Sequence, residues 1–449
     1  MKYRYRNKDE MKDSGVEWLG EIPLEWEIIR SKYLWKKEKR EINDNYGVIT
    51  AFRDGEVTLR TNRRTEGFTF AIKEIGYQGV LEGDLVISAM DAFAGAMGIS
   101  DSEGKCSPVY SVCSPLKELV PKYYKYILKE MSQKGYILSL AKGIRERSTD
   151  FRYVEFANTF LLYPNIEEQN ILAKFIDEKT TQFDKIILKK EVLIKRLEEA
   201  KKSLISEVVT GKVKVVETED VYELEEIKKE EMKDSGVEWL GEVPRSWGIS
   251  RIKYEAKINA RIGWKALKAD EYVENGYVFL ATPNIKGKKI DYTNVNYITK
   301  ERYDESPELK LNIEDVLLTK DGSTLGTVNV VRDLEQEATV NSSIAVVRSN
   351  KNLNGIYLNY FIKSNYIQNR ITLVKDGMGV PHLFQSDIKI FNVLLPSYDE
   401  QILISKYIDD KLVEIDNLIN STGQQIVKIK EAKQSLISEV VTGKIEILE

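Results

Sequence analysis

The stretch that decides the fold runs from Glu167 to Gly211 and reads EEQNILAKFIDEKTTQFDKIILKKEVLIKRLEEAKKSLISEVVTG. It recurs from Asp399 to Gly443 as DEQILISKYIDDKLVEIDNLINSTGQQIVKIKEAKQSLISEVVTG, 232 residues further along the chain. In both copies apolar residues follow one another at steps of seven, four and three, which keeps them on one face of a coiled-coil helix. This seam comprises Ile176, Phe183, Ile187, Ile194, Leu197, Leu204 and Val208 in the first copy, and Ile408, Ile415, Ile419, Ile426, Ile429, Leu436 and Val440 in the second. The sequence therefore predicts the same long helix twice.

A helix of this length would extend for roughly 65 Å at 1.5 Å per residue, which is longer than a small domain is wide. It cannot bury its apolar seam against itself, so the simplest partner is the repeated helix. We therefore expect the two helices to pair antiparallel and to act as a spacer. Glu167 and Glu168 suit the positive end of the helix dipole, and Gly211 and Gly443 stand where helices commonly end.

A second repeat precedes each long helix. Residues 10–26 read EMKDSGVEWLGEIPLEW and residues 231–247 read EMKDSGVEWLGEVPRSW, at an offset of 221. We interpret this arm as a packing motif in which Trp18, Leu19, Pro23 and Trp26 dock a short segment on the following domain. The chain then divides into an arm and first domain (1–164), a long helix (165–212), an acidic linker (213–230), a repeated arm and second domain (231–396), and a second long helix with a tail (397–449).

The two predicted domains share a design but differ in sequence. Short β-rich runs, such as 84–88 in the first and 315–319 in the second, alternate with turns, and residues 123–140 and 355–371 are expected to be helical. The fold class predicted is α+β: two similar mixed α/β domains separated by two long antiparallel coiled-coil helices, with a pseudo-twofold internal repeat. Two domains of one fold with unlike surfaces indicate two unlike ligands, or two unlike pieces of one ligand.

The composition bounds the class of protein. A chain of 449 residues with 42% hydrophobic residues is long enough for two or more folded domains. No apolar run approaches the roughly 18 to 20 residues that cross a bilayer, and the start MKYRYRNKDE is not a secretory signal, so we expect a cytoplasmic protein without a membrane partner. Cys106 and Cys113 have no second pair and His382 is the one histidine, so a zinc site lacks ligands and two reduced thiols are expected.

The net charge of −4 argues at first against a nucleic-acid partner, but the charge is unevenly distributed. Residues 217–238 hold ten acidic residues and three lysines, whereas residues 30–64 hold ten basic residues and five acidic ones. Basic clusters in an acidic protein are typical of a DNA binder whose other surfaces face other proteins. Ordinary solvated lysines are the alternative interpretation of each cluster.

Motifs of catalysis are missing from the sequence. There is no phosphate loop, and no Asn-Pro-Pro-aromatic motif of the kind that an amino-methyltransferase uses to hold its target base. His382 has no matching histidine in the other half that would act as a general base. The Glu-Ala-Lys sequences at 199–201 and 431–433 are expected on a solvated helix face.

The loops between strands are the candidate binding sites, with solvated turns as the alternative. Residues 320–326 (KDGSTLG) offer a cation, two hydroxyls and backbone NH groups to a phosphate, and residues 375–382 (KDGMGVPH) are rich in glycine. Residues 143–152 (GIRERSTDFR) carry arginines, whose fork spans O6 and N7 of guanine. The candidate DNA-binding residues are Arg53, Arg60, Arg63, Arg64, Arg145, Arg147, Ser148, Arg152, Arg261, Lys265, Lys320, Ser323, Thr324, Lys375 and His382.

Several stretches of the sequence, mostly in duplicate, carry a family resemblance. They are DSGVEWLGEIPLEW (13–26), EGDLVIS (82–88), GKCSPVYSV (104–112), GIRER (143–147), LLYPNIEEQ (161–169) and SLISEVVTGK (203–212). In this order they resemble the specificity subunit of a type I restriction-modification system. The resemblance implies two target-recognition domains, each of which reads one half of a split site in double-stranded DNA.

The resemblance also implies partners. The long helices would serve as a spacer and as a docking surface for two methyltransferase (modification) subunits, which methylate adenine N6 with S-adenosylmethionine. Restriction subunits would join them and cut unmodified DNA with ATP and magnesium. These cofactors would belong to the partners, so no cofactor, metal or catalytic residue is expected in this chain. One departure is the loop SAMDAFAGAMG (88–98), which lacks a counterpart of Lys320, so the two domains are not expected to share that contact.

Three other functions stay open at this stage. The chain would be a coiled-coil scaffold or adaptor if its twin domains bind proteins, and its affinity would then be insensitive to salt. It would be an enzyme if the loop 145–152 holds an unrecognised active site. It would serve a related restriction type if its partners are fused to each other.

Overall fold

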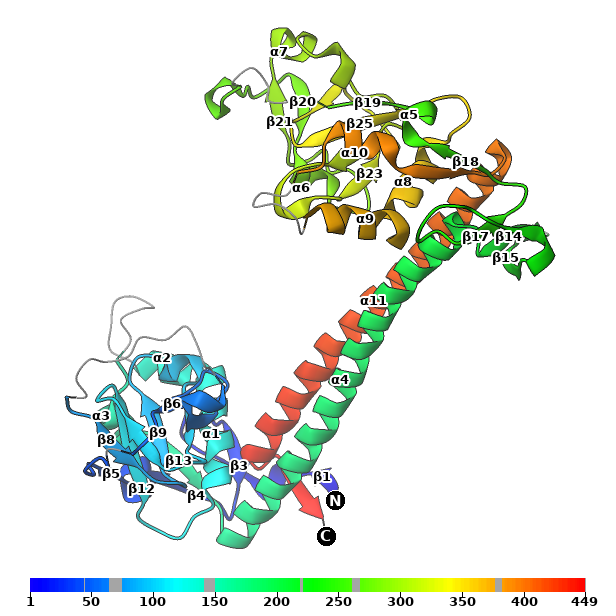
Figure 1. Ribbon diagram of the computed structural model, residues 1–449. Helices are drawn as coiled ribbons and strands as arrows, with labels where there is room; N and C mark the ends of the chain where they lie inside the picture. The colour runs from blue at the N-terminus through cyan, green and yellow to red at the C-terminus, as the bar shows by residue number, and fades with distance from the viewer. Residues whose placement is uncertain are drawn as a thin grey trace. The chain divides into compact units, whose positions relative to one another are not determined.

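The structure, a computed structural model, describes residues 1–43, 45–63, 75–140, 150–218, 221–260, 267–375 and 382–448. The chain forms two compact units (Figure 1). The first unit is Met1–Lys190 with Gln424–Glu449, and the second unit is Glu191–Gly423. Within the described ranges, no helix is long and apolar enough to cross a membrane.

The two long helices predicted from the repeat are α4 (Ile166–Val209) and α11 (Tyr398–Val441), each of 44 residues. Each contributes one segment to the first unit and one to the second. All fourteen seam residues are buried or half-buried. Leu188 and Val192, which lie off the seam, are 60% and 42% exposed. The seam is therefore the buried face of both helices.

In the first unit the segments of α4 and α11 run antiparallel. Asp184 forms an ion pair with Lys433 at 2.6 Å. One to two turns further along α4, Lys190 Nζ donates to Gln425 Oε1 at 2.5 Å. Successive contacts thus involve higher residue numbers in α4 and lower residue numbers in α11, as in an antiparallel pair.

The second unit repeats this pairing. Lys201 of α4 forms an ion pair with Asp416 of α11 at 2.6 Å. Asp416 and Lys433 are the second-copy equivalents of Asp184 and Lys201, so the same ion pair occurs once in each unit. Ile205 of α4 belongs to the same apolar core as Ile404, Tyr407 and Ile408 of α11.

Each unit contains a four-stranded antiparallel sheet. The strand order is β10-β9-β12-β5 in the first unit and β23-β22-β25-β19 in the second. Cys113 pairs with Lys37 on one side and with Leu85 on the other, and Val347 holds the same place in the second unit. The strands are β5 (Trp35–Glu38), β9 (Leu85–Ser88), β10 (Met97–Ile99), β12 (Tyr110–Pro115), β19 (Ala256–Asn259), β22 (Val316–Thr319), β23 (Val328–Val330) and β25 (Ile344–Ser349).

Each predicted domain helix is in fact two helices. The first consists of α1 (Pro121–Gln133) and α2 (Tyr136–Leu140), which are separated by Gly135 with a φ of +71°. Glycine adopts this left-handed conformation without steric cost, so it ends α1. The second consists of α8 (Gly355–Lys363) and α9 (Asn365–Lys375), which are separated by Ser364 with an extended backbone.

The units differ in a second, smaller β-region with its own apolar core. In the first unit this region consists of two two-stranded sheets, formed by β6 (Ile49–Ala51) with β7 (Val57–Leu59) and β8 (Gln78–Val80) with β11 (Gly104–Cys106). In the second it is one three-stranded sheet of β21 (Asn296–Ile298), β20 (Tyr277–Leu280) and β24 (Ala338–Val340), in which β20 and β24 are parallel. The stretches in which the two halves differ in sequence thus form different strand arrangements.

Short elements complete the units. They are β4 (Glu27–Arg30), β13 (Phe160–Tyr163) and α3 (Tyr153–Asn158) in the first, and β18 (Gly248–Arg251), β26 (Asn392–Leu395), α5 (Ile252–Glu255), α6 (Thr282–Ile285), α7 (Lys300–Asp304) and α10 (Gln385–Ile390) in the second.

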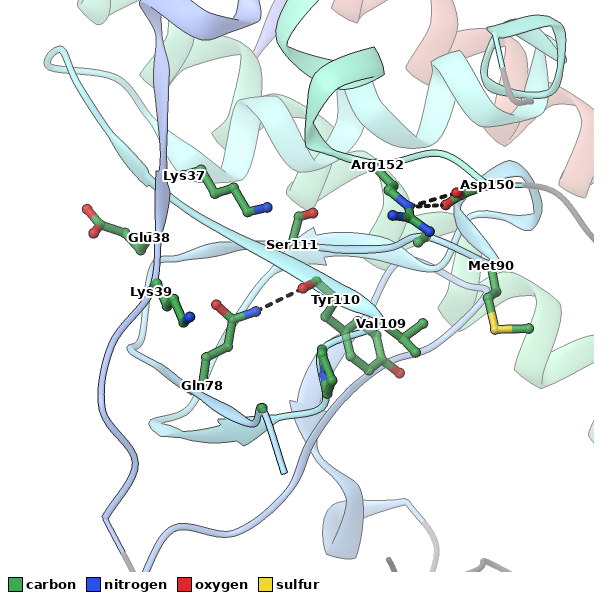
Figure 2. A pocket seen from close by; sticks show the side chains of 13 residues that line it. Lys37, Glu38, Lys39, Gln78, Met90, Val109, Tyr110, Ser111, Asp150 and Arg152 are labelled. Carbon is green, nitrogen blue, oxygen red and sulfur yellow. Dashed lines mark hydrogen bonds and ion pairs between the residues drawn. The ribbon is translucent and has the colours of Figure 1, made fainter. Parts of the chain in front are cut away.

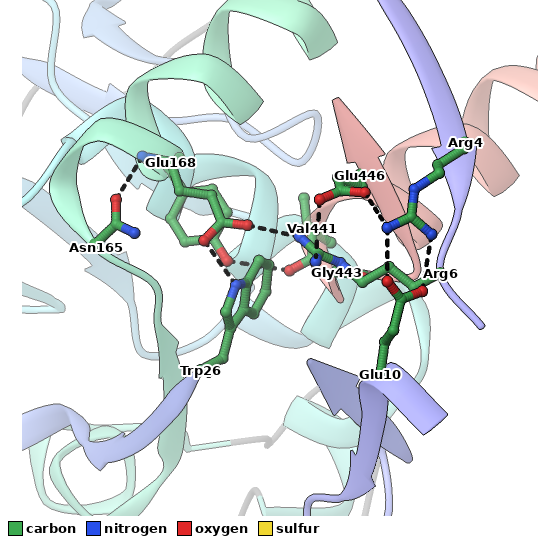
Figure 3. Close-up of polar contacts among 10 residues, drawn as sticks. Arg4, Arg6, Glu10, Trp26, Asn165, Glu168, Val441, Gly443 and Glu446 are labelled. Carbon is green, nitrogen blue, oxygen red and sulfur yellow. Dashed lines mark hydrogen bonds and ion pairs between the residues drawn. The ribbon is translucent and has the colours of Figure 1, made fainter. Parts of the chain in front are cut away.

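The repeated arms form the hairpins β2 (Met11–Asp13) with β3 (Glu21–Pro23) and β16 (Met232–Asp234) with β17 (Glu242–Pro244). Trp26 Nε1 donates to Glu168 in the first turn of α4 at 2.9 Å (Figure 3). The equivalent Trp247 donates to Glu400 of α11 at 3.0 Å. Each arm therefore binds the start of a long helix.

The other arm tryptophan behaves differently in the two copies. Trp18 is 7% exposed and stacks on Tyr136 of α2 at a centroid distance of 5.5 Å. Trp239, its equivalent, is 59% exposed. The packing role expected of this tryptophan thus holds in the first copy alone, where α2 supplies the ring that covers it.

The stretch 213–230, predicted as an acidic linker, contains a β-hairpin of β14 (Val213–Thr218) and β15 (Val221–Glu226). Val215 of this hairpin is buried in the core of the second unit, whereas the glutamates of β15 are exposed. In the first unit β1 (Lys2–Tyr5) and β27 (Ile445–Leu448) pair in the same register, although they come from opposite ends of the chain. The terminal pair is thus the counterpart of the internal hairpin.

A circular permutant tests this equivalence. Leu448 pairs with Lys2, so a bond from residue 449 to Met1 closes a two-residue hairpin loop, and the chain is opened between residues 219 and 220. We expect the permutant to melt within about 4 °C of the parent, because its contacts are unchanged and one short loop replaces another. A permutant opened inside α1 is the control and should lose cooperative unfolding. Equal damage in both permutants would contradict the equivalence.

Candidate nucleic-acid interface

In the second unit the structure brings together the two loops that the sequence singled out. The backbone N–H of Leu383 donates to Lys320 O, and that of Lys320 donates to Ser343 O, both at 2.8 Å. Asp321 and His382 form an isolated antiparallel bridge, and the carboxylate of Asp321 contacts the imidazole Nδ1 of His382. Residues 320–326 and the end of 375–382 therefore meet at the edge of the sheet where β22 ends.

The first unit repeats this backbone arrangement. The N–H of Phe151 donates to Ala89 O at 2.9 Å, and that of Ala89 donates to Val109 O at 3.0 Å. The loop after β9 thus meets the end of the stretch 143–152, as its counterparts do in the second unit. Asp150 and Arg152 hold the positions of His382 and Phe384, 232 residues earlier. The backbone arrangement of these loops is therefore the same in both units, whereas the side chains at equivalent positions differ.

The edge of the sheet in the first unit is hollowed (Figure 2). The hollow has a volume of about 740 Å³ and is lined by Lys37, Lys39 and Arg152 together with Glu38 and Asp150. Arg152 Nε donates to Asp150 Oδ1 at 2.8 Å, and its side chain is 71% exposed. A guanidinium in this exposed position can leave one carboxylate and bind a phosphate or a guanine edge.

The floor of this hollow is formed by uncharged groups. Gln78 Nε2 donates to Tyr110 O at 2.8 Å, which orients the amide along the strand. Burial raises the pKa of the Tyr110 phenol, so the hydroxyl stays neutral and can both donate and accept. Met90 adds an exposed apolar side chain at the rim. Cationic, neutral polar and apolar groups side by side are what base-edge readout requires.

The predicted arginines of the β6–β7 region make contacts with acidic or polar side chains. Arg53 pairs with Asp91 at 2.9 Å, and Arg63 pairs with Asp54 at 2.7 Å. Arg60 Nε donates to Thr50 Oγ1 at 3.2 Å. A phosphate that binds Arg53 or Arg63 would have to displace a carboxylate.

The candidate DNA-binding residues of the second unit differ in their exposure to solvent. Lys320 does not present its ammonium to solvent, because its side chain is 6% exposed and lies 3.3 Å from Asp321. The phosphate contact of Lys320 stays a prediction; in the structure its ammonium lies next to the carboxylate of Asp321. Ser323 is exposed and Thr324 is half-buried, so their hydroxyls are the accessible groups of this loop.

Several candidates lie outside the described residues: Arg64, Arg145, Arg147, Ser148, Arg261 and Lys265. Lys375 is the last residue of α9, and its side chain is not described.

Sequence reasoning missed Lys37, Lys39 and Phe384. Lys37 and Lys39 alternate in and beyond β5, so a period of two in the basic run 36–40 was the available signal. Phe384 is half-exposed and its ring contacts that of His382 at a centroid distance of 4.4 Å. The offset of 232 from Arg152 would have identified it.

Both cysteines are free, in line with the two reduced thiols expected from the sequence. Both are also buried, and burial raises the pKa of each thiol to about 12. A thiol of this kind is inert at neutral pH. Among the described residues no group of three or more histidine, cysteine or acidic side chains is arranged to hold a metal ion.

Comparison with known proteins points to one family. The profile of the type I restriction modification DNA specificity domain matches residues 244–431. The type I restriction enzyme MjaVIII specificity subunit of Methanocaldococcus jannaschii is 24% identical over 442 residues, 95% of this chain and 94% of that relative.

Two solved structures share the fold. One, described as the structural basis underlying complex assembly and conformational transition of the type I R-M system, superposes with a TM-score of 0.68 at 15% identity, over 94% of this chain and 99% of that chain. The other, the HsdS subunit from Thermoanaerobacter tengcongensis, superposes with a TM-score of 0.55 at 15% identity, over 96% and 99%.

Two substitutions in the hollow of the first unit make a matched pair. Arg152→Ala removes the exposed guanidinium and is expected to weaken duplex binding by about 1 to 3 kcal/mol. Asp150→Asn removes the carboxylate that competes with DNA for Arg152, so it should strengthen binding a few-fold. Binding is measured by fluorescence anisotropy at fixed salt, with Arg251→Ala, an exposed arginine of the second unit, as the control. Identical affinities for all three variants would show that this hollow does not face DNA.

Proposed function

We infer that this chain, which belongs to the family of type I restriction-modification specificity subunits, recognises a DNA sequence in two unlike parts. The observation that carries the proposal is the pair of sheet edges. Both units present loops on the same strand order and register, but the side chains are Met90, Asp150 and Arg152 in one and Asp321, His382 and Phe384 in the other. Unlike side chains on one scaffold read unlike bases, so the recognised site is asymmetric and bipartite.

Catalysis is assigned to partner subunits. We propose that modification subunits methylate adenine N6 with S-adenosylmethionine and that restriction subunits cleave with ATP and magnesium. This division is supported by the sequence, which lacks a phosphate loop and the base-holding motif of amino-methyltransferases. The role of this chain is then to bind and position the DNA.

The duplication also supports a complex with two modification subunits. Ile186 of α4 is 44% exposed and its second-copy equivalent, Leu418 of α11, is 55% exposed. Each is an apolar side chain on the outer face of a helix whose seam is already buried. Equivalent exposed apolar positions on the two helices favour two equivalent partners, each bound at one copy.

The salt dependence of DNA binding distinguishes this proposal from the alternative that the chain is a protein scaffold. The complex of the chain with its modification subunits should bind a duplex that carries its site with a steep dependence on salt, because bound phosphates release counterions. A shuffled duplex should bind more weakly by a factor of about 10³ or more at physiological salt. Equal binding of both duplexes, or affinity unchanged between 50 and 200 mM salt (roughly the range over which DNA binders lose most affinity), would support a protein scaffold instead.

The spacing between the two half-sites is proposed to depend on the length of the helix pair. Inserting one heptad after Arg196 in α4 and one at the antiparallel position in α11, after Ser421, keeps the seam on one face. Seven residues add about 10.5 Å, or about three base pairs at 3.4 Å each. We therefore expect the unread gap of the modified motif to lengthen by about three base pairs, while both read parts stay the same.

The modified motif is determined by sequencing methylated adenines in cells that express the variant with its modification subunits. A heptad inserted in α4 alone is the control, and it should abolish modification because the two paired helices then differ in length by one heptad. An unchanged gap in the doubly extended variant would refute the spacer role.

A further inference from the structure

A second basic hollow lies within the second unit, beside the helix segments and away from the sheet edge described above. It has a volume of about 570 Å³. Its basic lining residues are Lys286, Lys288 and Lys289 from the loop after α6, Arg332 after β23, Lys363 of α8 and Lys201 of α4. Two acidic residues of α11, Asp409 and Asp416, also line it. We call this site the lysine hollow.

The acidic residues neutralise only part of this charge. Asp416 binds Lys201 at 2.6 Å and Lys288 at 2.5 Å. Asp409 binds the Arg332 guanidinium through two hydrogen bonds of 2.8 and 2.9 Å. The remaining lining cations, Lys286, Lys289 and Lys363, make no ion pair with any described residue. The hollow therefore has six basic lining residues and two acidic ones, so positive charge is in excess.

A buried amide in the hollow also lacks a partner. Asn359 of α8 is 1% exposed and lines the hollow, and its Oδ1 accepts no hydrogen bond in the described structure. A buried polar atom without a partner costs about 1 to 3 kcal/mol, so the site is incomplete as it stands. A half-turn of the amide would present Nδ2 to an anion. Beside it, burial and the neighbouring Arg332 lower the pKa of Lys363 to about 8, and a bound anion would oppose that shift.

The first unit provides an internal comparison, because most of the surrounding contacts are duplicated. The Tyr126 hydroxyl contacts Asp177 of α4, as the Tyr360 hydroxyl contacts Asp409 of α11. Lys129, the counterpart of Lys363, has a pKa that burial and Lys433 lower and that the nearby Asp54 raises. The loop of the first unit that corresponds to the three lysines contains Asp54, which forms an ion pair with Arg63. The lysine hollow is not a requirement of the shared fold, which points to a ligand of the second unit.

The position of the hollow indicates the ligand. Asp321 of the base-facing loop follows β22, and Arg332 follows β23 beyond the opposite end of the same antiparallel pair. The Glu314 N–H donates to Val331 O, so Arg332 lies beside the residues about seven positions before Asp321, or roughly 23 Å away at about 3.3 Å per residue. This is about twice the roughly 12 Å width of the major groove, so a duplex whose groove receives the loop would bring backbone from outside the read base pairs to the hollow.

We propose that the lysine hollow binds the sugar–phosphate backbone of DNA next to the half-site that the second unit reads. The inference rests on the proposed function and deepens it. Lys286, Lys288 and Lys289 supply cations on an exposed loop, while Asn359 and Lys363 supply donors at the bottom of the hollow. This contact is independent of base sequence and is made on one side of the bipartite site only, because the first unit has Asp54 in the corresponding place.

The test is a salt titration of DNA binding by the complex of the chain with its modification subunits. The variant K286Q/K288Q/K289Q is compared with K253Q/K300Q/K351Q, which removes three exposed lysines elsewhere in the same unit. We expect the first variant alone to reduce the log–log salt slope by about 2 to 3 and to weaken cognate and shuffled duplexes by the same factor, on the order of 10- to 100-fold at 0.15 M salt. The methylated motif should not change.

A second variant, K286Q/K289Q, keeps the ion pair between Lys288 and Asp416 and should lower the slope by about 2. A slope equal to that of the control in both variants would overturn the proposal, as would a loss confined to the cognate duplex, which would indicate base reading. Loss of the modification subunits with an unchanged slope would assign the hollow to an acidic segment of a partner protein and would also overturn it. If the unaltered complex itself binds DNA without salt dependence, the proposed function fails, and that outcome is distinct from failure of the hollow.

Discussion

The burial of one apolar seam by its own duplicate is the constraint on which the rest of the structure depends. A 44-residue helix with an exposed apolar stripe is not stable alone, and most of its stability comes from tertiary packing. The ends of these helices also complete the domain cores: Val440 and Val441 belong to the core of the first unit, and Val208 and Val209 to that of the second. Each unit therefore contains segments from both halves of the sequence, and neither half contains a complete unit.

Several ion pairs and hydrogen bonds also occur once in each unit. The ion pair between the helices and the bond from an arm tryptophan to the first helical turn each occur twice. A buried aspartate at the start of the central strand is also kept, but its arginine comes from beyond β5 for Asp84 and from β25 for Asp315. A buried carboxylate needs a cation, and any strand that brings one will serve. The two units therefore keep the same ion pair at this position, although the arginine comes from a different strand in each.

The sequence predicts the parts of this fold that rest on long periodic patterns. The seam, the helix ends and the repeated arms were all legible, because period and offset survive in a single sequence. The break of the domain helices at Gly135 and Ser364 could not be predicted, since an isolated glycine or serine is tolerated inside many helices.

The hairpin of β14 and β15 was predicted to be a linker because its acidic residues face solvent and only Val215 is fully buried. The burial of Lys320 could not be predicted for a related reason: whether a loop lysine points outward or toward the neighbouring aspartate depends on side-chain packing. The lysines of residues 286–289 were missed because their significance comes from Asn359 and Lys363, which are distant in sequence.

The central claim is that one chain reads two different half-sites through two copies of one scaffold. It is tested most directly by expressing the unaltered chain with its modification subunits in a host that lacks other adenine methylation, and by sequencing the methylated adenines of the whole genome. The account predicts one motif with two unlike specified parts separated by a gap of fixed length, with a modified adenine in each part. A palindromic motif, a continuous motif, or methylation without a sequence preference would contradict it.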